Sequence, residues 1–533
     1  MTVASPTPLP AIIALARSGA LDRARRLFRD VGLESVTDDP AILSVHGRLL
    51  KDEARQAPAT DRARLWREAG DAYARAAGLS GATYHLINAA TLALLAGDRT
   101  TADERAGRVL GKLDGGDTGP ETPYYVAATR AEALLLLGRT GDAESALREA
   151  LRLAPEAWED HASTLRQFTL ILDALDTDAA WLSPLQPPRS LHFAGPLALA
   201  DDAGLRARID AVLAEERIGF AYGALAGGAD LIISEAVLAQ GAELHLILPT
   251  PPDVFRAESA APLGGDWPAR FDAVLDQAAT LSIMDPHLTT TTMLHIQLAA
   301  EVAMGRAVMN AAAIASEAIQ LLVIHPDTAT GATAMIDEHW QRSGRRNIRL
   351  DAPRLSKAVG RGRPLPVGPG NGCLTAMLAV SLGEEDGPGP DTPPPGIMGR
   401  IAEALAGAAP PIVTPVFGGN VLHLAFANPA EAAGTAELIS RAFPATARIS
   451  GHYGVASLVE SPFGDKDALI GLSAEFAPDM LSSTPPGAIH LSETFTAALH
   501  GWAAISPGET PYVGDLPRGV ETMSVYALMP AGR

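Results

Sequence analysis

The chain has 533 residues but only one cysteine, Cys373, so it can form no internal disulfide and no zinc site built from cysteines. This scarcity fits a reducing compartment, and we expect a cytoplasmic protein. No stretch approaches the roughly 20 apolar residues that span a bilayer. The opening residues, MTVASPTPLP, show no basic or apolar run typical of a secretory signal.

Basic residues are also scarce. The chain has 42 Lys and Arg against 62 Asp and Glu, a formal charge of −20. Proteins that bind nucleic acids need Lys and Arg to neutralise phosphates, so we expect no nucleic-acid partner. The same deficit argues against an anionic membrane surface, and we expect no membrane partner.

The length is too great for one hydrophobic core and predicts a multidomain protein. Residues 8–185 have helical periodicity, and residues 188–352 alternate strand and helix patterns. A linker rich in Arg, Pro and Gly follows at residues 353–372, and residues 373–530 mix strands with helices. We therefore expect an α-helical repeat domain, an α/β domain with a mostly parallel sheet, and an α+β domain.

The clearest repeat runs from Tyr124 to Pro155. Ala131, Ala143 and Ala150 provide small residues where two paired helices would cross closely. Two weaker copies keep the same offsets with Gly19, Ala24, Phe28 and Val31, and with Ala90, Gly97, Ala102, Ala106 and Val109. This region resembles tetratricopeptide repeats, which implies a concave surface for a protein or peptide partner. The alternative is that the stack only packs on the rest of the chain. Tyr84, His85 and Asn88 are candidate partner contacts, although core packing is the role we expect for them.

The middle domain is organised around residues 220–249, which read as a βαβ unit. A glycine-rich turn, Gly223 to Gly228, lies between the first strand and the helix. A right-handed crossover places this turn at the carboxyl end of the strand, where open parallel sheets bind ligands. Because the first amides of a helix favour anions, the turn predicts a phosphate-binding loop.

The segment Gly223 to Asp230, G-x-L-A-x-G-x-D, followed by a helix, a glycine and a strand, resembles the SLOG superfamily of Rossmann-like nucleotide-binding domains. A second polar loop, Pro326 to Thr333, lies where relatives carry a glycine-rich phosphate motif. The resemblance implies a nucleotide-derived ligand between the two loops and names no other cofactor. The candidate ligand-binding residues are Gly195, Gly223, Gly227, Gly228, Asp230, Glu235, Asp327, Thr330, Gly331 and Thr333. Asp230 could instead cap the helix, and Glu235 could be solvated or salt-bridged.

The last domain carries FGGNVLHLAF at residues 417–426, RISGHYG at 448–454 and SSTPPGAIHLSETF at 482–495. Together these segments resemble a class III nucleotide cyclase homology domain, which implies a ferredoxin-like α+β fold and a homodimer. Cyclisation in that family needs two aspartates that hold two metal ions. Ser381 and Asn420 stand at those positions. Glu475 and Asp479 stand where the family has Asn and Arg.

Three functions follow from these patterns. The first is a non-catalytic signalling sensor or scaffold with a dimerising pseudo-cyclase domain. The second is an enzyme whose SLOG-like domain hydrolyses or transfers a nucleotide derivative, using Glu235 or Glu338 with an arginine. The third is an active cyclase with displaced metal ligands. The substituted aspartates favour the first, and we expect no catalytic residues and no metal site.

Overall fold

The protein is described by a computed structural model, whose contacts divide the chain into two compact units. The first unit comprises Met1–Pro187, Ala313–Ala315 and Pro530–Arg533, and the second comprises Pro188–Ala312 and Ser316–Met529. The residues that the structure describes are 8–117, 119–197, 199, 203–325, 331–352, 371–382, 397–460, 467–471, 473–502, 508–518 and 521–529.

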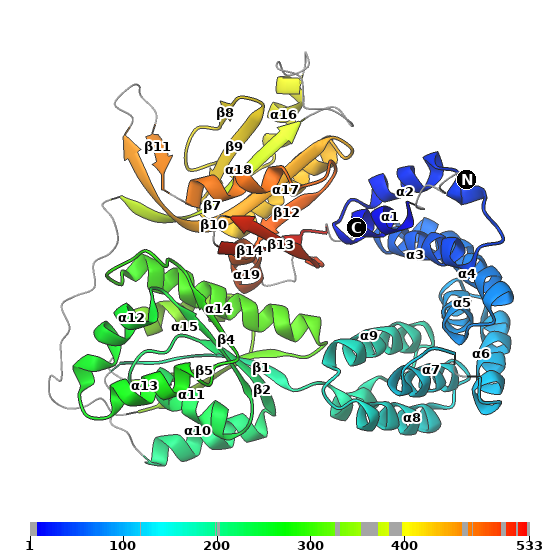
Figure 1. Cartoon of the computed structure of the whole chain (residues 1–533), viewed down its shortest axis with the longest axis horizontal. Helices are drawn as coiled ribbons and strands as arrows, with labels where there is room; N and C mark the ends of the chain where they lie inside the picture. Colours follow the sequence, from blue (N-terminus) through cyan, green and yellow to red (C-terminus); the bar gives the residue numbers. More distant parts are fainter. Residues whose placement is uncertain are drawn as a thin grey trace, which may run out of the picture. The chain divides into compact units, whose positions relative to one another are not determined.

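The first unit is built from successive helix pairs (Figure 1). The helices are α1 (Leu9–Arg17), α2 (Leu21–Asp30), α3 (Pro40–Gln56), α4 (Ala59–Ser80), α5 (Thr83–Leu95), α6 (Arg99–Asp114), α7 (Pro123–Leu136), α8 (Thr140–Leu153) and α9 (Trp158–Ala174), with short 3₁₀ turns η1 (Leu33–Ser35) and η2 (Ala180–Leu185). The expected helical repeat region is therefore confirmed.

Three of these pairs turn in the same way. Gly19, Gly97 and Gly138 follow the first helix of their pairs with φ of 83°, 85° and 73°. Each glycine N–H, and the N–H of the next residue, bonds back to carbonyls of the preceding helix. This is the Schellman arrangement, which needs a left-handed residue and so selects glycine. The repeated glycines thus mark the same kind of helix ending in all three pairs.

The second unit begins with a parallel six-stranded sheet in the order β4-β3-β2-β1-β5-β6. Its strands are β1 (Arg189–Ala194), β2 (Ile218–Gly223), β3 (Glu243–Leu248), β4 (Thr280–Ile283), β5 (Ala318–Ile324) and β6 (Asn347–Asp351). Its helices are α10 (Ala203–Glu215), α11 (Ala229–Ala239), α12 (Pro252–Ser259), α13 (Trp267–Leu275), α14 (Met293–Ala313) and α15 (Ala332–Arg342), with the 3₁₀ turn η3 (Ala261–Leu263). The predicted parallel sheet is confirmed.

Helices cover both faces of this sheet (Figure 1). One core joins strand residues such as Phe193 to α10, α11 and α13. A second core, on the opposite face, joins Leu322 of β5 to Met304 of α14 and Trp340 of α15. The result is a three-layer α/β/α domain, in which the loops at the strand ends remain available for function.

The second sheet is mixed, in the order β13-β14-β12-β10-β7-β9-β8, with β11 paired to β10. Its strands are β7 (Gly372–Leu382), β8 (Val416–Gly418), β9 (Val421–Phe426), β10 (Ala447–Glu460), β11 (Asp467–Ile470), β12 (Ile489–Ser492), β13 (Tyr512–Arg518) and β14 (Glu521–Ala527). Its helices are α16 (Ile397–Leu405), α17 (Pro429–Ala442), α18 (Ser473–Leu481) and α19 (Glu493–Trp502). Alternate residues of β10 face different helices: Gly451 lies against Phe495 of α19, whereas Ser450 bonds to the Ala477 carbonyl of α18.

Among the described residues, no helix combines the length and the apolar character needed to cross a bilayer.

Candidate functional site

The described parts of the predicted ligand site lie at the carboxyl edge of the first sheet. β1 lies between β2 and β5, so Gly195, which follows β1, lies beside the loop that follows β2. At β1 the strand order reverses, because β2 to β4 extend to one side and β5 and β6 to the other. This is the topological switch point at which open α/β sheets bind ligands.

Asp230 links two of these loops. Asp230 is 6% exposed, and its carboxyl group accepts hydrogen bonds from the Gly195 N–H (2.9 Å) and the Ala226 N–H (3.3 Å). Burial raises the pKa of Asp230 to about 8, while the two backbone donors act in the opposite direction. Both of its partners are loop amides, so Asp230 fixes the loop after β1 to the loop after β2.

The glycines of these loops allow close approach between segments of the chain itself. A Cβ on Gly228, where φ is 84°, would lie 2.2 Å from the Leu197 carbonyl oxygen and 2.6 Å from that of Pro196. A Cβ on Gly195 would meet Ala229, and the Ala229 N–H already donates to the Pro196 carbonyl (3.2 Å). The segment after β1 therefore covers the start of α11, where a phosphate is predicted.

The two other loop glycines behave alike. A Cβ on Gly223 would lie 2.7 Å from the Phe193 ring, and one on Gly227 would lie 2.7 Å from the Ser259 carbonyl oxygen. Internal packing explains all four glycines, and their contact with a ligand stays a prediction.

The second predicted loop is only partly described. Asp327 and Thr330 lie outside the described residues. Gly331 precedes α15 with φ of 108°, and Thr333 is half-buried in the first turn of that helix. These two residues begin the helix that follows β5, at the sheet edge where the ligand is predicted.

The glutamates considered for catalysis are both paired with arginines. Glu235 of α11 receives two hydrogen bonds from Arg270 of α13, at 2.8 and 2.7 Å. Glu338 lies in α15, is exposed and pairs with Arg342 at 2.6 Å. The salt-bridged alternative is thus what the structure shows for Glu235, whose carboxylate joins two helices.

In the second sheet, Ser381 and Asn420, where the cyclase resemblance predicts metal-binding aspartates, lie close together. Ser381 near the end of β7 is the register partner of Val421, the residue directly after Asn420. Asn420 lies in the two-residue turn between β8 and β9, beside Gly419 with φ of 61°. These two predicted positions are therefore spatial neighbours, and they present a hydroxyl and an amide rather than two carboxylates.

The acids of α18 share one face. Glu475 and Asp479 are both exposed and lie one helical turn apart. Within the ranges that the structure describes, no three His, Cys, Asp or Glu side chains are grouped so that they could hold a metal ion. The residues present offer carboxylates on α18 and none at Ser381 or Asn420.

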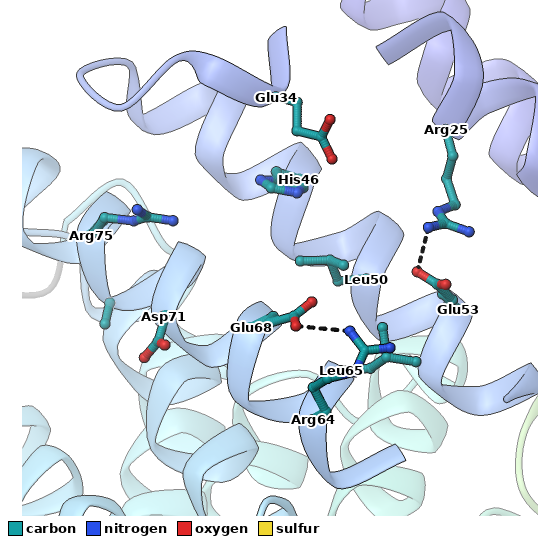
Figure 2. Close-up of a pocket in the computed structure, with 11 residues that line it drawn as sticks. Arg25, Glu34, His46, Leu50, Glu53, Arg64, Leu65, Glu68, Asp71 and Arg75 are labelled. Atoms are coloured by element: carbon teal, nitrogen blue, oxygen red, sulfur yellow. Dashed lines mark hydrogen bonds and ion pairs between the residues drawn. The ribbon is translucent and has the colours of Figure 1, made fainter. Parts of the chain in front are cut away.

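A pocket in the first unit was missed by the sequence reasoning. It has a volume of about 780 Å³ and lies over α3, between α2 and α4 (Figure 2). Its lining is mostly charged: Arg25, Glu34, His46, Leu50, Glu53, Arg64, Leu65, Glu68, Asp71, Ala74 and Arg75. In a sequence these charges look like ordinary solvated helix faces, so no motif distinguishes them.

Ion pairs organise this pocket. Arg25 contacts Glu53 at 2.9 Å and Arg64 contacts Glu68 at 2.8 Å, as Figure 2 shows. His46 lies in the same pocket, and burial lowers its pKa, so it is neutral near pH 7. A volume in the usual range of ligand pockets, roughly 300–1,000 Å³, with both signs of charge suits a polar ligand or the side chains of a partner.

The α5 residues proposed as core or partner contacts divide between the two roles. Tyr84 is 49% exposed, so the expectation of core packing is wrong for this residue. His85 and Asn88 are half-buried, and Asn88 donates to the Tyr84 carbonyl at 2.8 Å. Leu86, Ile87, Ala90, Ala93 and Leu94 of the same helix are buried in the core. Tyr84 is therefore available to a partner.

Comparison with known proteins gives partial matches. The model of a family described as Tetratricopeptide Repeats-Sensor matches residues 11–93. No curated protein matches the chain.

Solved structures similar to part of the chain include cyclase domains. The guanylyl cyclase domain of the RhoGC fusion protein from Blastocladiella emersonii is 15% identical, covers 30% of this chain and 96% of its own, and has a TM-score of 0.23. The guanylate cyclase domain of RhGC from Catenaria anguillulae, in complex with GTP, is 14% identical, with coverages of 30% and 97% and a TM-score of 0.24. The adenylyl cyclase CyaB from P. aeruginosa is 10% identical, with coverages of 30% and 94% and a TM-score of 0.23.

Proposed function

We propose that the protein is a non-catalytic, cytoplasmic signalling sensor or scaffold. The observation that supports this proposal is the pairing of Ser381 with Val421, which puts Ser381 beside Asn420, the two residues that the resemblance places where cyclases carry metal-binding aspartates. A hydroxyl and an amide there cannot replace two carboxylates as ligands for Mg²⁺ or Mn²⁺. Glu475 and Asp479 on α18 would repel a triphosphate rather than stabilise it.

The repeats are the proposed input. All the residues that line the α2–α4 pocket fall within the part of the chain that matches the sensor family model. Three arginines and four acids line it, so the proposed partner is a protein or peptide whose own charges can compete with the Arg25–Glu53 and Arg64–Glu68 pairs. Tyr84, exposed on α5, is a further proposed contact.

The α/β domain is the proposed small-molecule site. We place a nucleotide-derived ligand at the carboxyl edge of β1, β2 and β5, where the strand order reverses. Gly195, Gly331 and Thr333 lie at this edge, and the loop that Asp230 holds would form its floor. The domain with the second sheet would form the homodimer, and it would report on ligand rather than consume it.

Two measurements on the full chain test the proposal. The purified protein is denatured and any released small molecule is identified by mass spectrometry; a stoichiometric nucleotide derivative supports the sensor, and calorimetry with a nucleotide panel follows if nothing is released. Separately, the protein is incubated with ATP or GTP and Mn²⁺, and the nucleotides are separated by chromatography. We expect neither cyclic nucleotide nor hydrolysis product.

Each alternative has its own signature in these data. Cyclic nucleotide formation that Asn420→Ala abolishes would establish an active cyclase with displaced ligands. Hydrolysis that Glu235→Gln or Glu338→Gln abolishes would establish an enzyme in the α/β domain. Absence of any bound nucleotide derivative in both the extraction and the calorimetry would refute ligand sensing by this domain.

A further inference from the structure

One buried carboxylate in the second unit has no role in the proposed site. Glu301 lies in α14, on the face of the first sheet opposite α11, and is 1% exposed. Its neighbours along the helix, Ala300 and Val302, are buried and apolar. A charge buried in this way is costly unless hydrogen bonds satisfy it.

Two of the hydrogen-bond donors to Glu301 belong to the domain that contains the second sheet, which we call the second-sheet domain. The Tyr453 hydroxyl of β10 donates to Oε2 at 2.7 Å, and the Trp502 indole N–H of α19 donates to the same oxygen at 3.1 Å. Gln297, one turn earlier in α14, donates to Oε1 at 2.8 Å. The carboxylate therefore receives all three of these hydrogen bonds only when the α/β domain and the second-sheet domain are in contact.

The two helices at this contact approach through their backbones. A Cβ on Gly305 of α14 would lie 1.7 Å from the Ala497 carbonyl oxygen of α19. Gly501, one turn further along α19, faces Gly305 in return, with a built Cβ at 3.7 Å from its Cα. Only glycine at position 305 permits this approach.

Flanking contacts extend the same interface. Arg306 of α14 pairs with Glu493 at the start of α19 at 2.7 Å, with side chains 14% and 30% exposed. His339 of α15 packs edge-on against the Trp502 ring, with ring centroids 4.7 Å apart. Two helices of the α/β domain thus contact α19.

We propose that α14 is a dedicated docking helix, and that Glu301 and Gly305 join the α/β domain and the second-sheet domain into one cooperative unit. Glu301 acts as a positioning residue, because its carboxylate selects Tyr453 and Trp502 as partners. Gly305 sets the distance between α14 and α19. The inference does not depend on what the α/β domain binds.

Hydrogen-exchange mass spectrometry on the full chain, without added ligand, tests the interface. Gly305→Leu should raise exchange in both α14 and α19 by about tenfold or more, while the strands β2 and β3 stay protected. Gly434→Leu is the matched control, because Gly434 lies within α17 and a Cβ there meets nothing within 4 Å. Equal exchange of α19 in the two variants would overturn the proposal.

A second set of variants covers the case in which Gly305→Leu does not fold. Tyr453→Phe and Trp502→Phe should each speed exchange of α14, because each removes one donor to the carboxylate. In a Glu301→Met background, which keeps the bulk without the charge, the same two substitutions should have little further effect. Additive effects in that background would show that the residues do not act on one another and would refute the docking role.

Discussion

The two sheets of the second unit both carry loops that resemble ligand-binding motifs, yet the residues of those motifs are used differently. At the edge of the first sheet, Gly195 and Gly228 let the chain approach itself, and Asp230 fastens the loops together. At the edge of the second sheet, Ser381 and Asn420 lie close together and present a hydroxyl and an amide. The glycines of the first site are therefore explained by close approach of the backbone. The prediction for the second site depends instead on which chemical groups Ser381 and Asn420 present.

The strongest test of this comparison is Gly228→Ala. The left-handed φ of 84° and the 2.2 Å approach to the Leu197 carbonyl should together cost about 4 kcal/mol in the free energy of unfolding. Gly241→Ala is the control, since Gly241 has a similar φ of 75° but open space around its Cβ, and should cost only about 1 kcal/mol. Urea denaturation measures both, and equal losses would mean that the packing argument is wrong.

This result also determines how ligand binding can be studied. A side chain at Gly228 would disturb folding, so substitutions there cannot separate the two effects. Thr333→Val, which removes a hydroxyl on α15 without this clash, is the better variant for calorimetry.

Asp230→Asn should have the next largest effect. The oxygen of the Asn amide can accept a hydrogen bond from the Gly195 N–H. Its NH₂ group cannot accept from the Ala226 N–H, so two donors face each other, and the variant should lose about 1–3 kcal/mol in the free energy of unfolding. Asp210→Asn is the control, because Asp210 pairs with Arg206 at the surface with 42% exposure, and should change stability by less than about 1 kcal/mol. Thermal unfolding of the two variants compares them, and matching midpoints would disprove the loop-fastening role.

One histidine of the first sheet should make stability depend on pH. His192 in β1 is buried against Trp340, and burial lowers its pKa to about 3 from the ordinary value of 6.5. Between those values the unfolded chain holds a proton on His192 that the folded chain does not, so the contribution of His192 to stability falls as pH falls, by about 1.4 kcal/mol per pH unit. Asp230, whose pKa is raised, contributes with the opposite sign over the same range.

Denaturation at several pH values between 4 and 6 measures this slope. His192→Gln should reduce it by the equivalent of about one proton. His287→Gln, at an exposed position, should leave it unchanged. An unchanged slope in the first variant would contradict the account of His192.

The smallest expected effect concerns the second sheet. Ser381→Asp with Asn420→Asp restores both carboxylates and should create Mn²⁺ binding, measurable by calorimetry. Cyclase activity should remain absent, because Glu475 and Asp479 still occupy positions where the family has Asn and Arg. Adding Glu475→Asn and Asp479→Arg sharpens the test. Turnover by the double variant alone would show that the acids of α18 do not matter.

Much of the fold could be predicted because local patterns decide it. The hairpin turn at Gly419 and Asn420, and the helix ends at Gly97 and Gly138, need left-handed residues that sequence shows directly. Pro478 lies inside helix α18, so the sequence pattern does not predict this helix.

The contacts of the candidate sites could not be predicted, because they join residues far apart in the chain. Glu301 is visible in sequence only as a charge within an apolar helix, and its partners Tyr453 and Trp502 lie in another domain. From sequence, Glu235 could be either a general base or a partner in a salt bridge. Only the structure shows that Arg270 lies beside it.

The left-handed glycine that closes three of the helix pairs has no counterpart in the α3–α4 pair, where Ala57 and Pro58 make the connection. The charged pocket lies at this pair. Most of its lining residues therefore belong to the helix pair that lacks the left-handed glycine, within the part of the chain that matches the sensor family model. In this stack, the helix pair without the regular glycine ending is thus also the pair that carries most of the pocket.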